Sequence, residues 1–179
     1  MNEHAEIQAV SAQPDEPRAQ QAFDSASINR AGINKVEVLN NRLVPGSDGS
    51  IEHVVIGNNA VTVIRSTPLK GRVRVTRSDV YVGGISCSVL LSGLEARVNT
   101  VRHLVGGDAV VQGALFLTKQ RSAPVKRYKS ILIGAPKSII QELIDEHCDA
   151  PVNPLIERVT RELDAMFLPF DKLSDSSAA

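Results

Sequence analysis

The stretch "SIEHVVIGNNAVTVIRSTPLKGRV", from Ser50 to Val73, predicts two β-strands joined by a tight turn. The pair Asn58–Asn59 suits the centre of a type I′ turn, because asparagine tolerates positive φ. This register places Glu52 opposite Arg65, whereas a longer turn shifts it. Because side chains alternate along a strand, one face of the hairpin is expected to carry Glu52, Val54, Ile56, Val61, Val63, Arg65 and Thr67.

The rest of the chain predicts further strands and helices around this hairpin. Strands are expected at "KVEVLNNRLV" (35–44), "GRVRVTR" (71–77), "AVVQGALFLT" (109–118) and "ILIG" (131–134). Helices are expected at "SVLLSGLEARVNTVRHLV" (88–105), "PKSIIQELIDEH" (136–147, opened by Pro136) and "PLIERVTRELDAMF" (154–167, capped by Asn153). The glycine break "YVGGIS" (81–86) reads as a turn, and "KQRSAPVKRYKS" (119–130) as a basic loop. This order predicts an α/β fold with a mixed central β-sheet flanked by helices.

The length of 179 residues suits one domain with a real core. Residues 1–18 are polar and contain two prolines, so we expect a disordered tail there. Residues 19–173 are then the single domain, with a short helix within 19–33, and residues 174–179 are a second tail.

The composition favours a cytoplasmic protein without a membrane segment. No apolar run approaches the ~18 residues that a membrane-spanning helix needs. The polar, acidic start is unlike a secretory signal. The two cysteines, Cys87 and Cys148, make no disulfide framework or ligand cluster and are expected to be buried thiols.

Charge is distributed unevenly along the chain although the net charge is +0. Residues 1–64 hold 4 Lys/Arg and 8 Asp/Glu, residues 65–129 hold 12 and 3, and residues 130–179 hold 4 and 9. A basic centre favours a polyanion partner such as nucleic acid. The alternative is that the acidic ends fold back onto the basic centre.

The hairpin and its surroundings resemble the nuclease-related domain (NERD) family, a branch of the restriction-endonuclease-like, PD-(D/E)XK fold. The resemblance begins at "VLNNRLVPGS" (38–47), continues through 50–73, and covers about three quarters of the chain. In the hairpin the family typically has an Asn-Ile-Asp-His run, a Gly-containing turn, Val-Ile-(Asp/Glu)-x-Lys and a later Gly, which is Gly71 here. The "YVGG" segment, the helix with Gly93 and the final "MFLPF" are also similar to the family. The resemblance implies a restriction-endonuclease-like fold.

The resemblance also implies a catalytic site of two carboxylates and a lysine around Mg²⁺, and this chain departs from it. The first acid position is Glu52, but the second is Arg65, the lysine position is Thr67, and a position where many members carry Gln is Arg97. A guanidinium cannot bind a cation and stays charged at any working pH. We therefore expect an ion pair between Glu52 and Arg65, no metal and no cofactor. If a metal does bind, Mg²⁺ at Glu52 is the candidate.

Several basic residues near the hairpin are candidates for binding phosphate, or else form a solvated surface. The candidate nucleic-acid contacts are Arg65, Lys70, Arg72, Arg74, Arg77 and Arg97. Lys70 is also a candidate replacement for the missing catalytic lysine, although Pro68 interrupts the strand before it. The basic loop either follows a nucleic-acid backbone or is a plain surface loop.

The sequence predicts a catalytically degenerate nuclease domain that binds nucleic acid, or a protein partner, without cutting. The first alternative is an active Mg²⁺-dependent nuclease that uses Glu52 with a compensating Asp24 or Asp48. The second is a purely structural or protein-interaction module. His53 is adjacent to Glu52 but points to the other strand face, so a role as general base is not expected.

Overall fold

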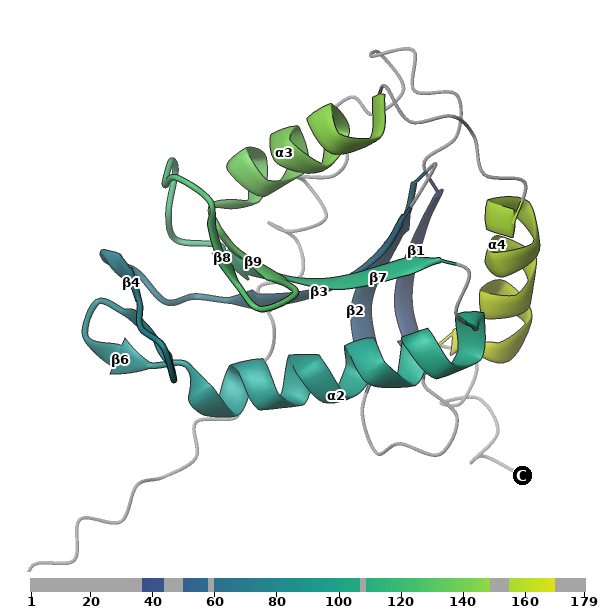
Figure 1. Ribbon diagram of the computed structural model, residues 1–179, viewed down its shortest axis with the longest axis horizontal. Coiled ribbons are helices and arrows are strands. Elements are labelled where there is room, and N and C mark those ends of the chain that lie inside the picture. Colours follow the sequence, from purple (N-terminus) through teal and green to yellow (C-terminus); the bar gives the residue numbers. More distant parts are fainter. Residues whose placement is uncertain (1–36, 44–49, 58–59, 107–108, 149–154, 170–179) are drawn as a thin grey trace, which may run out of the picture.

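A seven-stranded sheet forms the centre of the computed structural model, which describes residues 37–43, 50–57, 60–106, 109–148 and 155–169 (Figure 1). The strand order is β10-β1-β2-β3-β7-β9-β8. Its strands are β1 (Glu37–Leu43), β2 (Ser50–Ile56), β3 (Ala60–Thr67), β7 (Val110–Leu117), β8 (Lys126–Tyr128), β9 (Ile131–Gly134) and β10 (Leu168–Pro169). A second, three-stranded sheet contains β4 (Val73–Val75), β5 (Val80–Val82) and β6 (Ile85–Ser86).

The predicted hairpin register is confirmed. In the antiparallel pair of β2 and β3, Ile56 lies opposite Val61 and Val54 opposite Val63. The Gly57 N–H donates to the carbonyl of Ala60 at 2.9 Å, which closes the hairpin next to the turn. The turn residues 58–59 themselves lie outside the described residues.

The central sheet is mixed, as predicted. Strand β3 runs parallel to β7, and β7 runs parallel to β9. The other pairs, β1 with β2, β1 with β10 and β8 with β9, are antiparallel. A parallel pair needs a long crossover, and helix α2 (Ser88–Val105) lies between β3 and β7 in the chain.

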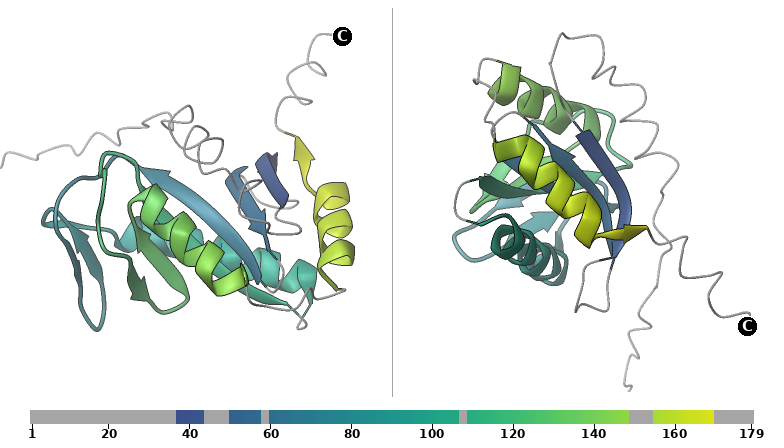
Figure 2. Two further views of the ribbon diagram at one scale, coloured as in Figure 1. Left: turned by 90° about the horizontal axis from the view of Figure 1, so that it is seen from above. Right: turned by 90° about the vertical axis from the view of Figure 1, so that its right-hand side faces the viewer.

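Helices cover both faces of the central sheet. Helix α2 packs on one face and α3 (Pro136–Cys148) on the other, while α4 (Leu155–Met166) lies near β1, at the far end from β4 and β6 (Figures 1 and 2). The α2 side contains Val54 and Val63 of the hairpin, and the α3 side contains Val55 and Ile64. Alternate hairpin residues thus enter opposite cores, so a one-residue slip would exchange the two sets.

The helical stripe predicted for residues 88–105 is confirmed. The residues of α2 that are buried against the sheet are Leu91, Leu94, Val98, Val101 and Val105. Cys87, just before α2, is a buried thiol as expected, whereas the side chain of Cys148 is not described. Within the described residues, no helix is long and apolar enough to cross a membrane.

Four short strands were not expected from the sequence. The supposed glycine break at 81–86 is the hairpin of β5 and β6, with Gly83 and Gly84 at positive φ in its turn. The basic loop contains β8, an edge strand whose charged side chains hide the apolar alternation typical of strands. Strand β10 has two residues and pairs with β1. The expected tails, the helix within 19–33, Asp24, Asp48 and the Asn153 cap lie outside the described residues.

Candidate functional site

Glu52, Arg65 and Arg97 come together from three elements, β2, β3 and α2. The Glu52 carboxylate accepts a hydrogen bond from the backbone N–H of Ser66 at 2.6 Å. Among the described residues no ion pair joins Glu52 to Arg65, so the expected pair is replaced by this backbone contact. Both arginines act on the carboxylate only as nearby charges.

Gly93 of α2 explains where the two guanidinium groups lie. A Cβ atom at this position would stand 2.9 Å from Nη1 of Arg65 and 3.4 Å from Nη1 of Arg97. The missing side chain leaves the space that these groups occupy. Arg97 is held there, because its Nε donates to the Ser50 carbonyl at 3.1 Å and its Nη1 to the Gly93 carbonyl at 3.2 Å.

The electrostatics of this cluster are unfavourable for a divalent cation. Burial raises the pKa of Glu52, against the opposing effects of the Ser66 hydrogen bond and of both arginines. Burial, and then the charge of Arg65, lower the pKa of Arg97. No group of three or more His, Cys, Asp or Glu side chains suited to a metal occurs in the described part of the chain. One hydrogen-bonded carboxylate beside two guanidinium groups does not fit Mg²⁺, which needs several oxygen ligands.

Replacing Glu52 separates its charge from its hydrogen bond. Glu52→Gln keeps an oxygen for the Ser66 N–H and removes a buried charge, so we expect stability at pH 7 equal to or above that of the wild type. Glu52→Ala leaves that N–H without its partner and should lower the free energy of unfolding by about 1–2 kcal/mol. Urea unfolding of the three proteins measures both effects. Equal destabilisation by Gln and Ala would show that the negative charge itself stabilises the cluster.

His53 lies on the opposite side of β2 from this cluster. It is buried, and its Nδ1 lies 2.8 Å from Oδ1 of Asn40. Burial lowers the pKa of His53 to about 4, so the imidazole is neutral at pH 7. It is therefore a buried, hydrogen-bonded histidine, as the strand alternation predicted.

The buried His53 should make the protein sensitive to mild acid. The His53 imidazole takes up a proton near pH 6.5 in the unfolded chain, but only near its pKa of about 4 in the folded chain. The contribution of the neutral imidazole to the free energy of unfolding is therefore complete above pH 6.5 and is lost as the pH falls towards 4. Between pH 7.5 and 5 the loss amounts to about 2 kcal/mol. Urea unfolding measures the difference in the free energy of unfolding between pH 7.5 and pH 5. This difference should be smaller in His53→Gln than in the wild type, and the same as in the wild type for His103→Gln, whose side chain is exposed. Identical differences in all three proteins would contradict this assignment.

A basic pocket lies at the carboxyl ends of the adjacent parallel strands β3 and β7. Its volume is about 780 Å³, and it is lined by residues 70–73, 119–124 and Lys126. Its cations are Lys70, Arg72, Lys119, Arg121 and Lys126, and none of its lining residues is acidic. None of these cations forms an ion pair with a described residue. The carboxyl ends of strands in open α/β sheets are where ligands commonly bind.

Hydrogen bonds hold the two walls of the pocket together. The backbone N–H and the hydroxyl of Thr118 both donate to the carbonyl of Thr67, at 3.0 and 3.2 Å. Further out, the Gln120 amide donates to the carbonyl of Gly71. The buried Thr67, at the lysine position of the resemblance, thus supports the base of the pocket through its backbone.

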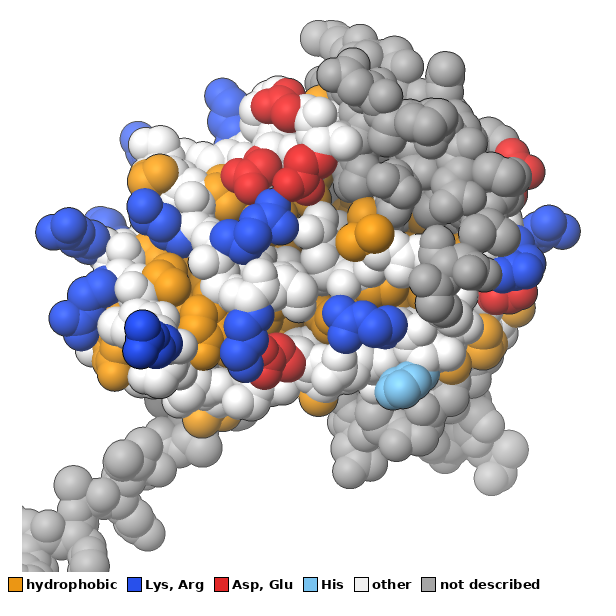
Figure 3. All heavy atoms as spheres, viewed as in Figure 1, with side chains coloured by type: hydrophobic (Ala, Val, Ile, Leu, Met, Phe, Trp, Pro, Cys, Tyr) orange, Lys and Arg blue, Asp and Glu red, His pale blue; other side chains and the backbone are white. Residues whose placement is uncertain are grey.

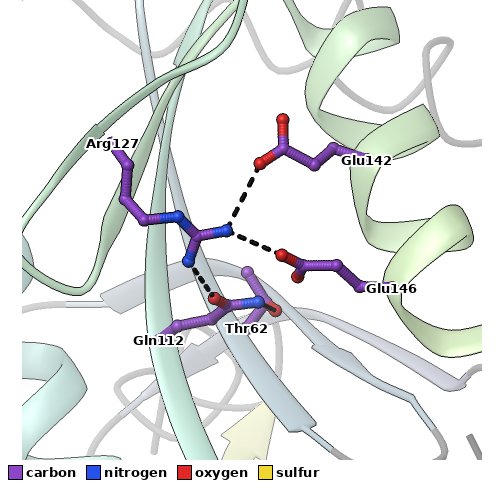
Figure 4. Close-up of polar contacts among 5 residues, drawn as sticks. All are labelled: Thr62, Gln112, Arg127, Glu142 and Glu146. Carbon is purple, nitrogen blue, oxygen red and sulfur yellow. Dashed lines mark hydrogen bonds and ion pairs between the residues drawn. The ribbon is translucent and has the colours of Figure 1, made fainter.

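The other two cations of the basic loop are engaged in structural contacts. Arg127 of β8 pairs with Glu142 at 3.3 Å and with Glu146 at 2.7 Å, both on α3 (Figure 4). It also donates to Gln112 of β7 at 3.4 Å. Lys129 pairs with Glu95 of α2 at 2.7 Å. The loop is therefore divided between cations that fix β8 and cations that line the pocket.

The remaining predicted contacts lie beside the pocket. Arg74 of β4 is exposed and lies over the ring of Tyr81, 4.8 Å from its centroid. Arg77 is exposed in the turn that follows β4. The structure thus places Lys70 and Arg72 in the pocket, and Arg65 and Arg97 at Gly93. Arg74 and Arg77 belong to the small sheet and its turn, outside the pocket lining.

Sequence reasoning did not join the two basic segments into one pocket. The topology explains their proximity, because the loops that follow two adjacent parallel strands lie at the same edge of the sheet. Comparisons with protein-family models, curated proteins and solved structures gave no match to this chain. The likeness to nuclease-related domains therefore rests on the sequence features alone.

Proposed function

We propose that this protein binds nucleic acid through backbone phosphates and does not cleave it, on a restriction-endonuclease-like scaffold with a degenerate site. The observation that carries the proposal is a set of cations that form no ion pair with any described residue, gathered at the end of the molecule that bears β4 and β6 (Figure 3). The set consists of Lys70, Arg72, Arg77, Lys119, Arg121 and Lys126, and these residues form the basic surface.

Unpaired, exposed cations are what binding to a phosphate backbone requires. Each contact releases condensed counterions from the nucleic acid, which provides affinity without regard to sequence. Surface cations that serve stability are commonly paired, as Arg127 and Lys129 are here. The basic surface has no such role in the described structure.

The absence of cleavage is inferred from the chemistry of the cluster at Gly93. Phosphodiester hydrolysis assisted by a metal needs carboxylates that hold the ion and polarise the phosphate. Among the residues that the structure describes, Glu52 is the one carboxylate at this cluster, and two guanidinium groups accompany it. Residues Asp24 and Asp48, which an active nuclease would recruit, lie outside the described residues, so this alternative is left to experiment.

Salt-dependent binding tests the proposal directly. Fluorescence anisotropy with labelled single-stranded and duplex DNA and RNA should show a linear fall of log K with log salt, with a slope of about −0.7 per phosphate contact for single strands and −0.9 for duplexes. No binding to any of these at about 50 mM salt would contradict the proposal and favour a structural or protein-interaction module. A cytoplasmic location remains a prediction from the sequence.

A further inference from the structure

The basic pocket has the chemistry of an anion site rather than a base-reading site. Its five cations face a volume of about 780 Å³, within the range of pockets that take small ligands. The described residues that line it include no aromatic side chain on which a base would stack. Recognition there would depend on charge.

The concentration of positive charge favours a multiply charged ligand. Like charges gathered in one pocket repel one another, and no acidic side chain among the described lining residues relieves this repulsion. A phosphate diester within a strand carries one negative charge, whereas a terminal phosphate monoester carries about 1.5 to 2 at pH 7 and offers three acceptor oxygens. The monoester neutralises more of the pocket and fits a concave site better than a continuous backbone does.

Two connected segments of the chain bring these cations to one pocket. Lys70 and Arg72 come from the segment after β3, and Lys119 and Arg121 from the segment after β7. The bonds from Thr118 to Thr67 and from Gln120 to Gly71 join these segments. Opposing cations on two connected walls can contact different oxygens of one phosphate group.

We propose that this pocket binds a terminal phosphate monoester, carried by the end of a nucleic-acid strand or by a mononucleotide. The strand-end form rests on the proposed binding of nucleic acid. If the pocket binds strand ends, the basic surface binds phosphorylated ends more tightly than strand interiors.

Matched oligonucleotides test this preference. Anisotropy is measured with 3′-labelled single-stranded 12-mers that carry either a 5′-phosphate or a 5′-hydroxyl, and with 5′-labelled 12-mers that carry either a 3′-phosphate or a 3′-hydroxyl. We expect at least one phosphorylated end to bind about tenfold more tightly than its hydroxyl counterpart. The variant Lys119→Gln with Arg121→Gln should lose this preference. The matched control Arg158→Gln with Arg161→Gln, on α4 at the far end of the sheet from β4 and β6, should keep it.

Two additions separate the possible outcomes. Displacement of the labelled strand by a nucleoside 5′-monophosphate would extend the site to free nucleotides, and failure to displace it would assign the site to strand ends. The Lys119 and Arg121 variant should melt at the same or a higher temperature than the wild type, because its pocket has less repulsion. Equal binding of phosphate and hydroxyl ends, with steep salt dependence, would overturn this inference and leave the proposed function standing. No binding of any oligonucleotide or nucleotide would overturn both.

Discussion

Reversing Arg72 and Arg77 together to Glu should lower the affinity for nucleic acid by about 100-fold at about 100 mM salt. Both side chains are exposed, and neither forms an ion pair within the described structure. Each lost phosphate contact costs roughly tenfold at this salt, and the new carboxylates add repulsion. Arg74 is left in place because its guanidinium lies on Tyr81 and supports the small sheet.

The matched control reverses Arg158 and Arg161, which makes the same change in net charge on helix α4, at the far end of the sheet from β4 and β6. We expect this control to retain affinity within about threefold of the wild type, since these sites lie away from the basic surface. Anisotropy titrations of the three proteins at several salt concentrations measure affinity and slope together. If both reversals weaken binding equally, the effect is one of net charge and the basic surface is not the contact site.

Replacing Gly71 by Ala should unfold or strongly destabilise the small sheet and the adjacent pocket wall. Gly71 has φ of +127°, and a Cβ there would stand 2.6 Å from the Cα atom and 3.0 Å from the N atom of Gly83. Both contacts involve backbone, so no flexible side chain can move aside. We expect a loss of about 3 kcal/mol in the free energy of unfolding, from backbone strain and steric overlap together.

Gly84→Ala is the control for this substitution. Its φ of +89° is also unfavourable for alanine, but no heavy atom lies within 4 Å of the added Cβ. Gly84→Ala should therefore lower the free energy of unfolding only by the strain of alanine at positive φ, about 1–2 kcal/mol. Urea unfolding compares the two variants. Equal losses would mean that the approach of Gly71 to Gly83 does not constrain the fold.

The parts of the fold that repeat a simple period were predictable. The hairpin register followed from Asn58–Asn59 and the alternation on either side, and β2 and β3 pair in that register. The stripe of α2 followed from helical spacing. The strands that escaped prediction, β5, β6, β8 and β10, have only two or three residues each, which is too short for an alternating pattern to show.

The site was predictable in its residues but not in its contacts. The register predicted that Glu52 and Arg65 lie near each other, and Arg65 does act on the Glu52 carboxylate as a nearby charge. The carboxylate nevertheless bonds to the Ser66 N–H, and the guanidinium lies against Gly93, a residue of a separate helix. No pattern within the hairpin carries that information. Likewise, the division of the basic loop depends on Glu142 and Glu146, which α3 brings to Arg127 only in the folded chain.

The most direct test of the central claim follows one labelled oligonucleotide through binding and recovery. The protein is incubated with a 5′-phosphorylated strand at about 50 mM salt with Mg²⁺ or Mn²⁺, and each sample is divided between a native and a denaturing gel. We predict a retarded complex on the native gel and an intact strand on the denaturing gel, with either metal. Metal-dependent cleavage that Glu52→Ala abolishes, or the absence of any retarded complex, would contradict the account.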